Sequence, residues 1–401
     1  MEKESDQNFG QWARKYPELG TGPVPIEPCV SPEHFELERE RIFKRVWLNV
    51  GRDEEIANPG DYYVKDMAVW GTSIIVMRGR DGKVRAFHNM CSHRGNKLAW
   101  DTKGNCRAIT CKFHGWSYDT AGRLTGVPDE KNFFEFKRAD HGLTPVATDV
   151  WEGFIFVHLD PNPKETLREY LGEVADQLEG YPFGQLSTRF TYLADERVNW
   201  KVLLDAQQEG YHLPVLHRRT FSKTIVSEES ATNAYRSVAM RLYKYHRMLA
   251  TSGVGDQASV LTPIETLSRR FGATTMAAMG GGTYTGNAKT VLTGSFDFWV
   301  IFPNFVLALM EGTYFTYNLW PQSVAHTLWE VRTYYPPAKN AGERFSQEYA
   351  KCTLRDPLLE DGGVHEKVQS MLASGARSHF TFQDEETLLR HGHHVVAEFV
   401  K

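Results

Sequence analysis

The chain has 401 residues, of which 41% are hydrophobic and 24% charged, and a formal net charge of −4. This length suits two or three domains, and the charge gives no reason to expect nucleic acid or an anionic membrane surface as a partner. Five cysteines are too few for a disulfide framework, so we interpret Cys29, Cys106 and Cys352 as ordinary thiols. The polar start lacks the features of a signal peptide, and the most apolar run, 298–310, is too short to span a bilayer. We therefore expect a cytoplasmic protein.

The first 160 residues are expected to form an arm and a β domain. Gly and Pro are frequent in residues 1–30, and Ser31 followed by Pro32 predicts a helix that runs to about Phe43. The pair Asp81-Gly82 predicts a hairpin. Short β-type runs between turns occupy residues 62–64, 74–77, 84–87, 108–110 and 154–158. The run Asp160-Pro161-Asn162-Pro163 is typical of a loop between domains. We therefore expect an arm over 1–44, a β domain over 45–160 and a second domain over 161–401.

The stretch 91–116 carries two pairs of candidate metal ligands, separated by 17 residues. The pairs are Cys91-x-His93 and Cys111-x-x-His114. A zinc finger pairs Cys with Cys and His with His, whereas each pair here combines a thiolate with an imidazole. This donor set suits a [2Fe–2S] cluster in which two Cys hold one iron and two His hold the other. Gly95 and Gly115 follow the pairs, where the backbone must curl around sulfur.

The same stretch resembles the Rieske motif. Its flanks HRG and FHGWSYD resemble the oxygenase and ferredoxin branch of that family. The respiratory branch has one more Cys in each loop, where this chain has Asn96 and Phe113. The alternatives for these four residues are a zinc ribbon and four unrelated polar side chains.

Beyond residue 160 the pattern is mixed. Residues 296–335 alternate as two or three long strands. We expect the region 250–290, rich in Gly, Ala, Thr and Met, to form loops and short helices near a pocket, or a surface insertion. The other expected elements are a strand at 188–198 and helices at 165–178, 199–213, 343–352, 363–374 and 384–399. The sequence therefore predicts an α+β chain.

His212 and His217 form the core of a second candidate metal site. Residues five apart on a regular helix point roughly 140° apart, so the two could share a metal only if the helix ends between them. Pro214 predicts such a break. Two His and one carboxylate form the facial triad of non-haem Fe(II) oxygenases, which leaves coordination positions open.

Together with the Rieske motif, this segment makes nearly the whole chain resemble the catalytic α subunit of Rieske non-haem iron oxygenases. The matching residues are Asn199, Trp200, Lys201, Glu209, Tyr211, His212 and His217. The late stretch 360–369 fits the family pattern E-D-x4-E-x-x-Q, which implies Asp361 as the third iron ligand, with Asp384 and Asp356 as alternatives. The implied fold is a small antiparallel β Rieske domain plus a helix-grip (START-like) catalytic domain with a curved antiparallel sheet and a long C-terminal helix.

Glu209 departs from the family pattern, which usually has Asp at this position. The resemblance implies that this residue bridges His114 of a neighbouring subunit and His212 in electron transfer. Glu here resembles the branch that oxidises quaternary ammonium compounds. Asp205 is the alternative bridge, and His393 and His394 are taken as surface residues.

The resemblance implies a terminal oxygenase with one [2Fe–2S] cluster and one Fe(2+). A separate NAD(P)H reductase, with or without a ferredoxin, would supply electrons, because this chain has neither a dinucleotide-binding motif nor plant-type ferredoxin spacing. The expected reaction is mono- or cis-dihydroxylation, or oxidative dealkylation, of an aromatic or cyclic substrate. A homotrimer is implied, and the presence of a small β subunit stays open.

The substrate is less well defined by the sequence. Candidate pocket residues are Leu204, Gln208, Phe296, Phe298, Phe305, Leu307 and Tyr317. Because side chains alternate along a strand, about half of the strand residues would face elsewhere. An aromatic cage would also accept a quaternary ammonium compound such as carnitine or betaine. A non-catalytic Rieske electron carrier and a small-molecule binding module are the remaining alternatives.

Overall fold

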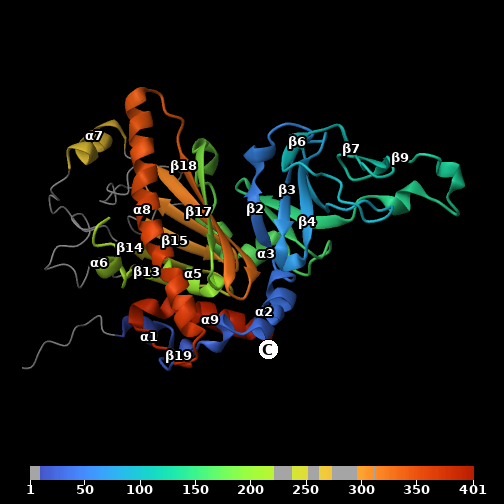
Figure 1. The fold of residues 1–401 in the computed structure, drawn as a ribbon. Helices are drawn as coiled ribbons and strands as arrows, with labels where there is room; N and C mark the ends of the chain where they lie inside the picture. The colour runs from blue at the N-terminus through green and yellow to red at the C-terminus, as the bar shows by residue number, and fades with distance from the viewer. Residues whose placement is uncertain (1–9, 221–236, 252–261, 273–295, 311) are drawn as a thin grey trace, which may run out of the picture. The chain divides into compact units, whose positions relative to one another are not determined.

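The computed structural model describes residues 10–220, 237–251, 262–272, 296–310 and 312–401. They form two compact units, Arg39–Ala175 and Met1–Glu38 with Asp176–Lys401, which are described separately (Figure 1). The sequence predicts domain boundaries after residues 44 and 160, whereas these two units divide after Glu38 and Ala175. Most of the region 250–290 lies outside the described residues, apart from helix α7 (Pro263–Phe271). None of the helices in the described ranges is long and apolar enough to cross a membrane.

The unit Arg39–Ala175 is built on antiparallel sheets. Seven strands pair in the order β2-β11-β10-β5-β4-β3-β6, and three more in the order β7-β8-β9. The strands are β2 (Leu48–Arg52), β3 (Asp61–Met67), β4 (Thr72–Arg78), β5 (Val84–His88), β6 (Lys103–Asn105), β7 (Ala108–Thr110), β8 (Ser117–Asp119), β9 (Leu124–Gly126), β10 (Pro145–Trp151) and β11 (Phe154–His158). All five β-type runs predicted in this region lie within these strands, and the turn at Asp81-Gly82 joins β4 to β5, as predicted.

Short helical segments lie at the two boundaries between the units along the chain. The predicted helix after Ser31 is α2 (Pro32–Glu38), which continues as a π-helical turn over Arg39–Phe43. Ser31 Oγ accepts a hydrogen bond from the backbone N–H of His34, as expected for an N-cap. The predicted helix at 165–178 is divided at Gly172 into α3 (Leu167–Leu171) and α4 (Glu173–Leu178). Gly172 adopts φ 50°, which ends α3.

The second unit is organised around a seven-stranded antiparallel sheet in the order β12-β18-β17-β16-β15-β14-β13. The strands are β12 (Thr188–Glu196), β13 (Ser237–Leu242), β14 (Arg247–Thr251), β15 (Phe296–Ile301), β16 (Phe305–Met310), β17 (Thr313–Ser323) and β18 (His326–Tyr335). The strongly alternating region 296–335 therefore supplies four neighbouring strands. This mixed architecture confirms the predicted α+β class and its curved antiparallel sheet.

Helix α8 (Ala341–Leu372) runs along this sheet (Figure 1). The prediction of two helices, 343–352 and 363–374, is wrong, because one helix of 32 residues continues through Pro357 and Gly362-Gly363. Its buried positions are Ser346, Gln347, Ala350, Leu354, Pro357, Asp361, His365 and Gln369. This spacing of three or four residues forms one helix face, so packing of that face outweighs the low helix propensity of Pro and Gly.

The N-terminal arm packs onto the same unit. Strand β1 (Val24–Pro25) pairs with β19 (His379–Phe380), and α1 (Gln11–Lys15) lies beside the start of the C-terminal helix α9 (Thr387–Val400), where Asp384 accepts hydrogen bonds from the N–H groups of Trp12 and Ala13. At the end of the arm, the buried carboxylate of Glu38 forms an ion pair with Lys201 and accepts a hydrogen bond from Trp200. The family-like triplet 199–201 thus anchors the arm to the helix that precedes the second metal site.

Candidate metal centres

The two Cys–His pairs lie on two loops with the same backbone pattern. The N–H of Cys91 donates to Asn96 O at 2.9 Å, and that of Cys111 donates to Trp116 O at 2.7 Å. Gly95 and Gly115 each donate back to the carbonyl of the Cys four residues earlier, and both have φ 75°. A positive φ at this point closes the turn without a Cβ penalty. The repeated geometry explains why the sequence requires glycine after each pair.

The four side chains of the pairs converge. The imidazoles of His93 and His114 have ring centroids 4.6 Å apart, and His93 stacks on Trp116 at 4.9 Å. Cys91 and Cys111 are buried and form no disulfide. Nδ1 of His93 is buried and has no hydrogen-bond partner in the described part of the chain. A buried nitrogen with a free lone pair beside two free thiols fits the donor set of a Rieske cluster.

Polar groups also surround the sulfur atoms. The hydroxyl of Tyr118 lies 3.2 Å from Cys91 Sγ, and Nδ2 of Asn96 donates to Cys111 Sγ at 3.5 Å. Burial raises the pKa of Cys91. For Cys111, burial is outweighed by hydrogen bonds from the backbone N–H groups of Phe113 and His114, so the pKa of Cys111 is lowered. These donors favour the thiolate that a metal ion requires.

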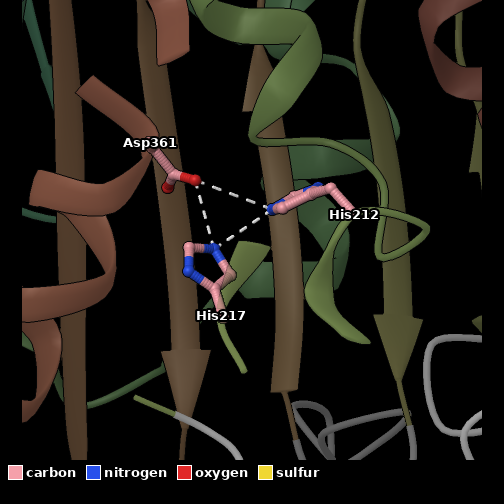
Figure 2. A group of neighbouring side chains, drawn as sticks. All are labelled: His212, His217 and Asp361. Carbon is pink, nitrogen blue, oxygen red and sulfur yellow. Dashed lines mark hydrogen bonds and ion pairs between the residues drawn. The ribbon is translucent and has the colours of Figure 1, made fainter. Parts of the chain in front are cut away.

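His212, His217 and Asp361 meet at a second point (Figure 2). Their ligand atoms all lie within 4.8 Å of one another. Oδ1 of Asp361 is 3.1 Å from Nε2 of His217 and 3.7 Å from Nε2 of His212, and the two Nε2 atoms are 3.2 Å apart. Asp361 comes from α8, whereas both His flank the short helix α6 (Leu213–Leu216). Two imidazole nitrogens and one carboxylate oxygen on one side of a common point fit a single iron ion.

The break that permits this geometry differs from the predicted one. Helix α5 (Trp200–Ala206) ends before both His residues, so the predicted helix to about residue 213 is too long. Pro214 stands in the first turn of α6 instead of ending a helix. That position suits proline, because the first N–H groups of a helix have no intrahelical acceptor. Non-helical backbone between Ala206 and Leu213 is what turns His212 toward His217.

Each candidate iron ligand is held by a second polar group. Glu209 Oε1 lies 2.5 Å from Nδ1 of His212, and Glu360 Oε2 lies 2.8 Å from Nδ1 of His217. Nε2 of Gln207 donates to Oδ2 of Asp361 at 3.0 Å. Carboxylates on Nδ1 direct the Nε2 lone pairs toward a metal. The roles of Glu360 and Gln207 were not predicted from the sequence, although both residues lie next to residues of the ligand motifs.

Electrostatics at this site follow from the same contacts. Burial lowers the pKa of His217, but its hydrogen bond and ion pair with Asp361, together with Glu360, outweigh burial, and the pKa is raised. Burial opposes ionisation of Asp361, but His217 outweighs it, so the pKa of Asp361 is lowered. Asp361 is therefore available as the anionic ligand that the triad needs.

The alternative residues lie elsewhere. Asp356 pairs with its neighbour Arg355, and Asp384 binds the N-terminal arm, so neither is grouped with the two His. Oδ2 of Asp205, the alternative bridge, lies 2.8 Å from Nε2 of His393. The prediction that His393 is a surface residue is wrong: it is 9% exposed, because α9 packs against α5. His394 is exposed, as predicted.

The candidate pocket residues divide between the two faces of the sheet. Cross-strand register pairs Val306 with both Val300 and Tyr317, so these three share a face with Phe298 and Phe296. Phe305 and Leu307 alternate with Val306 and point to the opposite face. Leu204 and Gln208 are buried on and after α5, and Gln208 accepts a hydrogen bond from the buried Arg247. The strand register thus separates Phe305 and Leu307 from the other three strand residues, Phe296, Phe298 and Tyr317.

Comparison with protein families identifies both units. Residues 46–143 match the Rieske [2Fe-2S] domain, and residues 183–401, more than half of the chain, match the ring hydroxylating alpha subunit (catalytic domain). The chain belongs to the ring-hydroxylating α-subunit family. The cofactors of this family are one [2Fe–2S] cluster and one mononuclear iron, as predicted.

Individual relatives of this α subunit differ in their substrates. This chain is 33% identical over 215 residues to the glycine betaine monooxygenase oxygenase subunit of Chromohalobacter salexigens; the match covers 53% of this chain and 47% of the relative. It is 34% identical over 197 residues to the carnitine monooxygenase oxygenase subunit of Escherichia coli K12 (48% and 52%). It is 30% identical over 261 residues to the anthranilate 1,2-dioxygenase large subunit of Acinetobacter baylyi (62% and 53%). The matched part spans about half the length of these relatives.

Solved structures support the fold of this α subunit. A quaternary ammonium Rieske monooxygenase aligns with a TM-score of 0.75 at 19% identity, covering 100% of both chains. Naphthalene 1,2-dioxygenase from Rhodococcus sp. aligns with a TM-score of 0.73 at 20% identity, covering 98% of both chains. The shared fold thus accommodates two different substrate classes.

Proposed function

We propose that this α subunit is the terminal oxygenase of a multicomponent system, and that it uses O2 and electrons from a separate NAD(P)H reductase to hydroxylate an aromatic or cyclic organic substrate. The observation that carries this proposal is the presence of two ligand sets in one chain. Cys91, His93, Cys111 and His114 would hold the [2Fe–2S] cluster, and His212, His217 and Asp361 would hold the iron. An iron held by three protein ligands supplies open positions at which O2 can be activated beside a substrate.

The roles of the chain's own residues follow from their contacts. Glu209 and Glu360 would keep a proton on Nδ1 of each imidazole, so that both Nε2 atoms face the metal. Glu209 would also bridge His212 to a Rieske His of a neighbouring subunit, which requires an assembly such as a homotrimer. The buried aromatic residues Phe298 and Tyr317 and the half-buried Phe296, with Leu204 and Gln208, would line the substrate pocket and exclude water.

A quaternary ammonium compound is the second candidate substrate. Similarity to glycine betaine and carnitine monooxygenase subunits favours it, as does Glu209 in place of the usual Asp. The aromatic rings of Phe298 and Tyr317, with centroids 6.1 Å apart, could face a trimethylammonium group. Similarity to the anthranilate dioxygenase subunit favours the aromatic class.

A single-turnover assay tests the proposal and separates the two classes. Protein reduced without oxygen would be exposed to O2 with aromatic acids, neutral aromatics, steroids or quaternary amines, and products would be identified by mass. We expect one class to incorporate oxygen from O2. Iron present at both sites, a cluster that reoxidises and no product from any class would contradict the assigned substrates. Absence of the second iron would favour an electron carrier instead.

A further inference from the structure

Two buried polar atoms beside the candidate iron site have no hydrogen-bond partner in the described part of the chain. They are Nε2 of His365 on α8 and Nε1 of Trp329 on β18. His365 is 2% and Trp329 1% exposed, so water does not reach them from the surface. Their rings are neighbours, with centroids 5.9 Å apart. Because a buried polar group without a partner is costly, two adjacent ones indicate a site that a ligand completes.

The position of this pair connects it to the iron ligands. His365 follows Asp361 by one helical turn, so both side chains leave the same face of α8. The ring of Trp329 contacts Tyr317 at 5.1 Å, and Tyr317 in turn contacts Phe298 at 6.1 Å. Burial raises the pKa of Tyr317 well above its usual value, and the negative charge of nearby Asp361 adds to this shift. His365 and Trp329 therefore lie on the same side of the sheet as Asp361 and the candidate pocket residues Tyr317 and Phe298.

The chemistry of the pair is defined by Glu196. Oε2 of Glu196 lies 2.7 Å from Nδ1 of His365, and both side chains are buried. A carboxylate accepts hydrogen bonds, so in the tautomer that pairs with Glu196 the single proton of the imidazole is on Nδ1 and Nε2 is an acceptor. The indole Nε1 of Trp329 is a donor only. A donor on one ring and an acceptor on the neighbouring ring match a hydroxyl group, which can accept from the indole and donate to the imidazole.

We propose that His365 and Trp329 are specificity-determining residues that bind a hydroxyl group of the substrate, with Glu196 as the positioning residue. A hydrocarbon would leave both atoms unpaired, and a carboxylate would pair with the indole but face the lone pair of the imidazole. The substrate class is therefore an organic molecule that carries an alcohol or phenol hydroxyl away from the oxidised carbon. This inference rests on the proposed function, because it concerns the same pocket.

Equilibrium binding of matched ligands tests the proposal. Titration calorimetry of the iron-loaded protein without oxygen would compare carnitine with γ-butyrobetaine and 2-hydroxybenzoate with benzoate, since each pair differs by one hydroxyl. The variants are Trp329→Phe and His365→Phe. Trp320→Phe is the matched control, because Trp320 is buried in the neighbouring strand, and its register partner Leu328 places it on the opposite face.

We expect the unmodified protein to bind the hydroxyl-bearing member of at least one pair about tenfold more tightly, the effect of one hydrogen bond. Both variants should lose this preference while binding the other member as before, and Trp320→Phe should retain it. Equal affinities within both pairs would overturn the proposal and indicate that the two atoms bind buried water only. A preference that persists in both variants would also overturn it. Iron content, the cluster spectrum and oxygenated product, measured on the same samples, report on the proposed function independently.

Discussion

Gln207 donates a hydrogen bond from Nε2 to Oδ2 of Asp361 at 3.0 Å. This contact engages one carboxylate oxygen and leaves the other, Oδ1, near the Nε2 atoms of His212 and His217. Gln207 therefore positions Asp361 to offer a single oxygen to the metal.

Replacing Gln207 by Leu should weaken iron binding by roughly 10–100-fold, the usual effect of removing an outer partner of a metal ligand. The measurement is competition for Fe(II) with a chelator. Gln322→Leu is the control, because Gln322 donates to a backbone carbonyl, that of Trp320, in β17. Equal iron affinity in Gln207→Leu and the control would mean that Gln207 does not position Asp361.

Glu209→Gln should retain both metal centres but slow the electron transfer between them. The amide oxygen of Gln can still accept from Nδ1 of His212, whereas the negative charge of the bridge is lost. If the loss of charge weakens this hydrogen bond by ~1.4 kcal/mol in the transition state, the rate of electron transfer falls about tenfold. The rate of cluster reoxidation by O2, followed by absorbance in a single turnover, measures this effect. Glu366→Gln, on the exposed side of α8, is the control; an unchanged rate in Glu209→Gln would exclude Glu209 as the bridge.

Tyr118→Phe should lower the reduction potential of the cluster. The hydroxyl of Tyr118 lies 3.2 Å from Cys91 Sγ, and a hydrogen bond to sulfur stabilises the more negative, reduced cluster. The loss of a hydrogen bond that contributes ~1 kcal/mol lowers a one-electron reduction potential by about 40 mV. Redox titration followed by absorbance or electron paramagnetic resonance gives the potential. Tyr62→Phe, in the same unit, serves as the control, and an identical potential for Tyr118→Phe would rule out this role of the hydroxyl.

Glu386 makes stability depend on pH. Burial raises the pKa of Glu386 to about 7, and the charges of Glu209 and Asp205 add to this shift. The folded protein therefore binds this proton more tightly than the unfolded chain, whose carboxyl titrates near 4.5. The stabilisation that this proton contributes is fully present below the unfolded pKa of 4.5, and it is lost as the pH rises through the folded pKa of about 7.

Glu386→Gln should accordingly reduce the fall in melting temperature between pH 5 and pH 8. Thermal unfolding of the metal-loaded protein at both values measures the difference. Glu398→Gln should behave as the unmodified protein does, because the pKa of the exposed Glu398 is lowered and lies below this window. The same pH dependence in Glu386→Gln and the unmodified protein would contradict the prediction.

Local sequence rules were sufficient for the Rieske unit. Its strands are bounded by turn residues, and Gly95 and Gly115 stand at the two positions of positive φ that the ligand loops need. The ligands of the cluster are close in sequence, so their spacing alone brings them together. The boundary at Gly172, by contrast, was missed because one glycine inside a helical pattern does not by itself predict a break.

Tertiary packing limited the prediction of the catalytic unit. Pro357 and Gly362-Gly363 predict an interrupted helix, but the buried face of α8 keeps it continuous. His393 looks like a surface residue near the end of the chain, but α9 packs against α5, where His393 meets Asp205, 188 residues away. The pairing of His365 with Glu196 is equally long-range. Such contacts leave no periodic or local signal in the sequence.

The most direct test of the central claim, that one chain holds two separate metal centres, is metal analysis of the His212→Ala variant. Iron, acid-labile sulfide and the visible cluster spectrum would be measured for this variant, for the unmodified protein and for His394→Ala, whose side chain is exposed. We predict about three iron atoms and about two sulfides per chain in the unmodified protein and in His394→Ala. His212→Ala should lose about one iron and all O2-dependent turnover, with an unchanged cluster spectrum. Loss of the cluster spectrum in His212→Ala, or full retention of iron, would contradict the account.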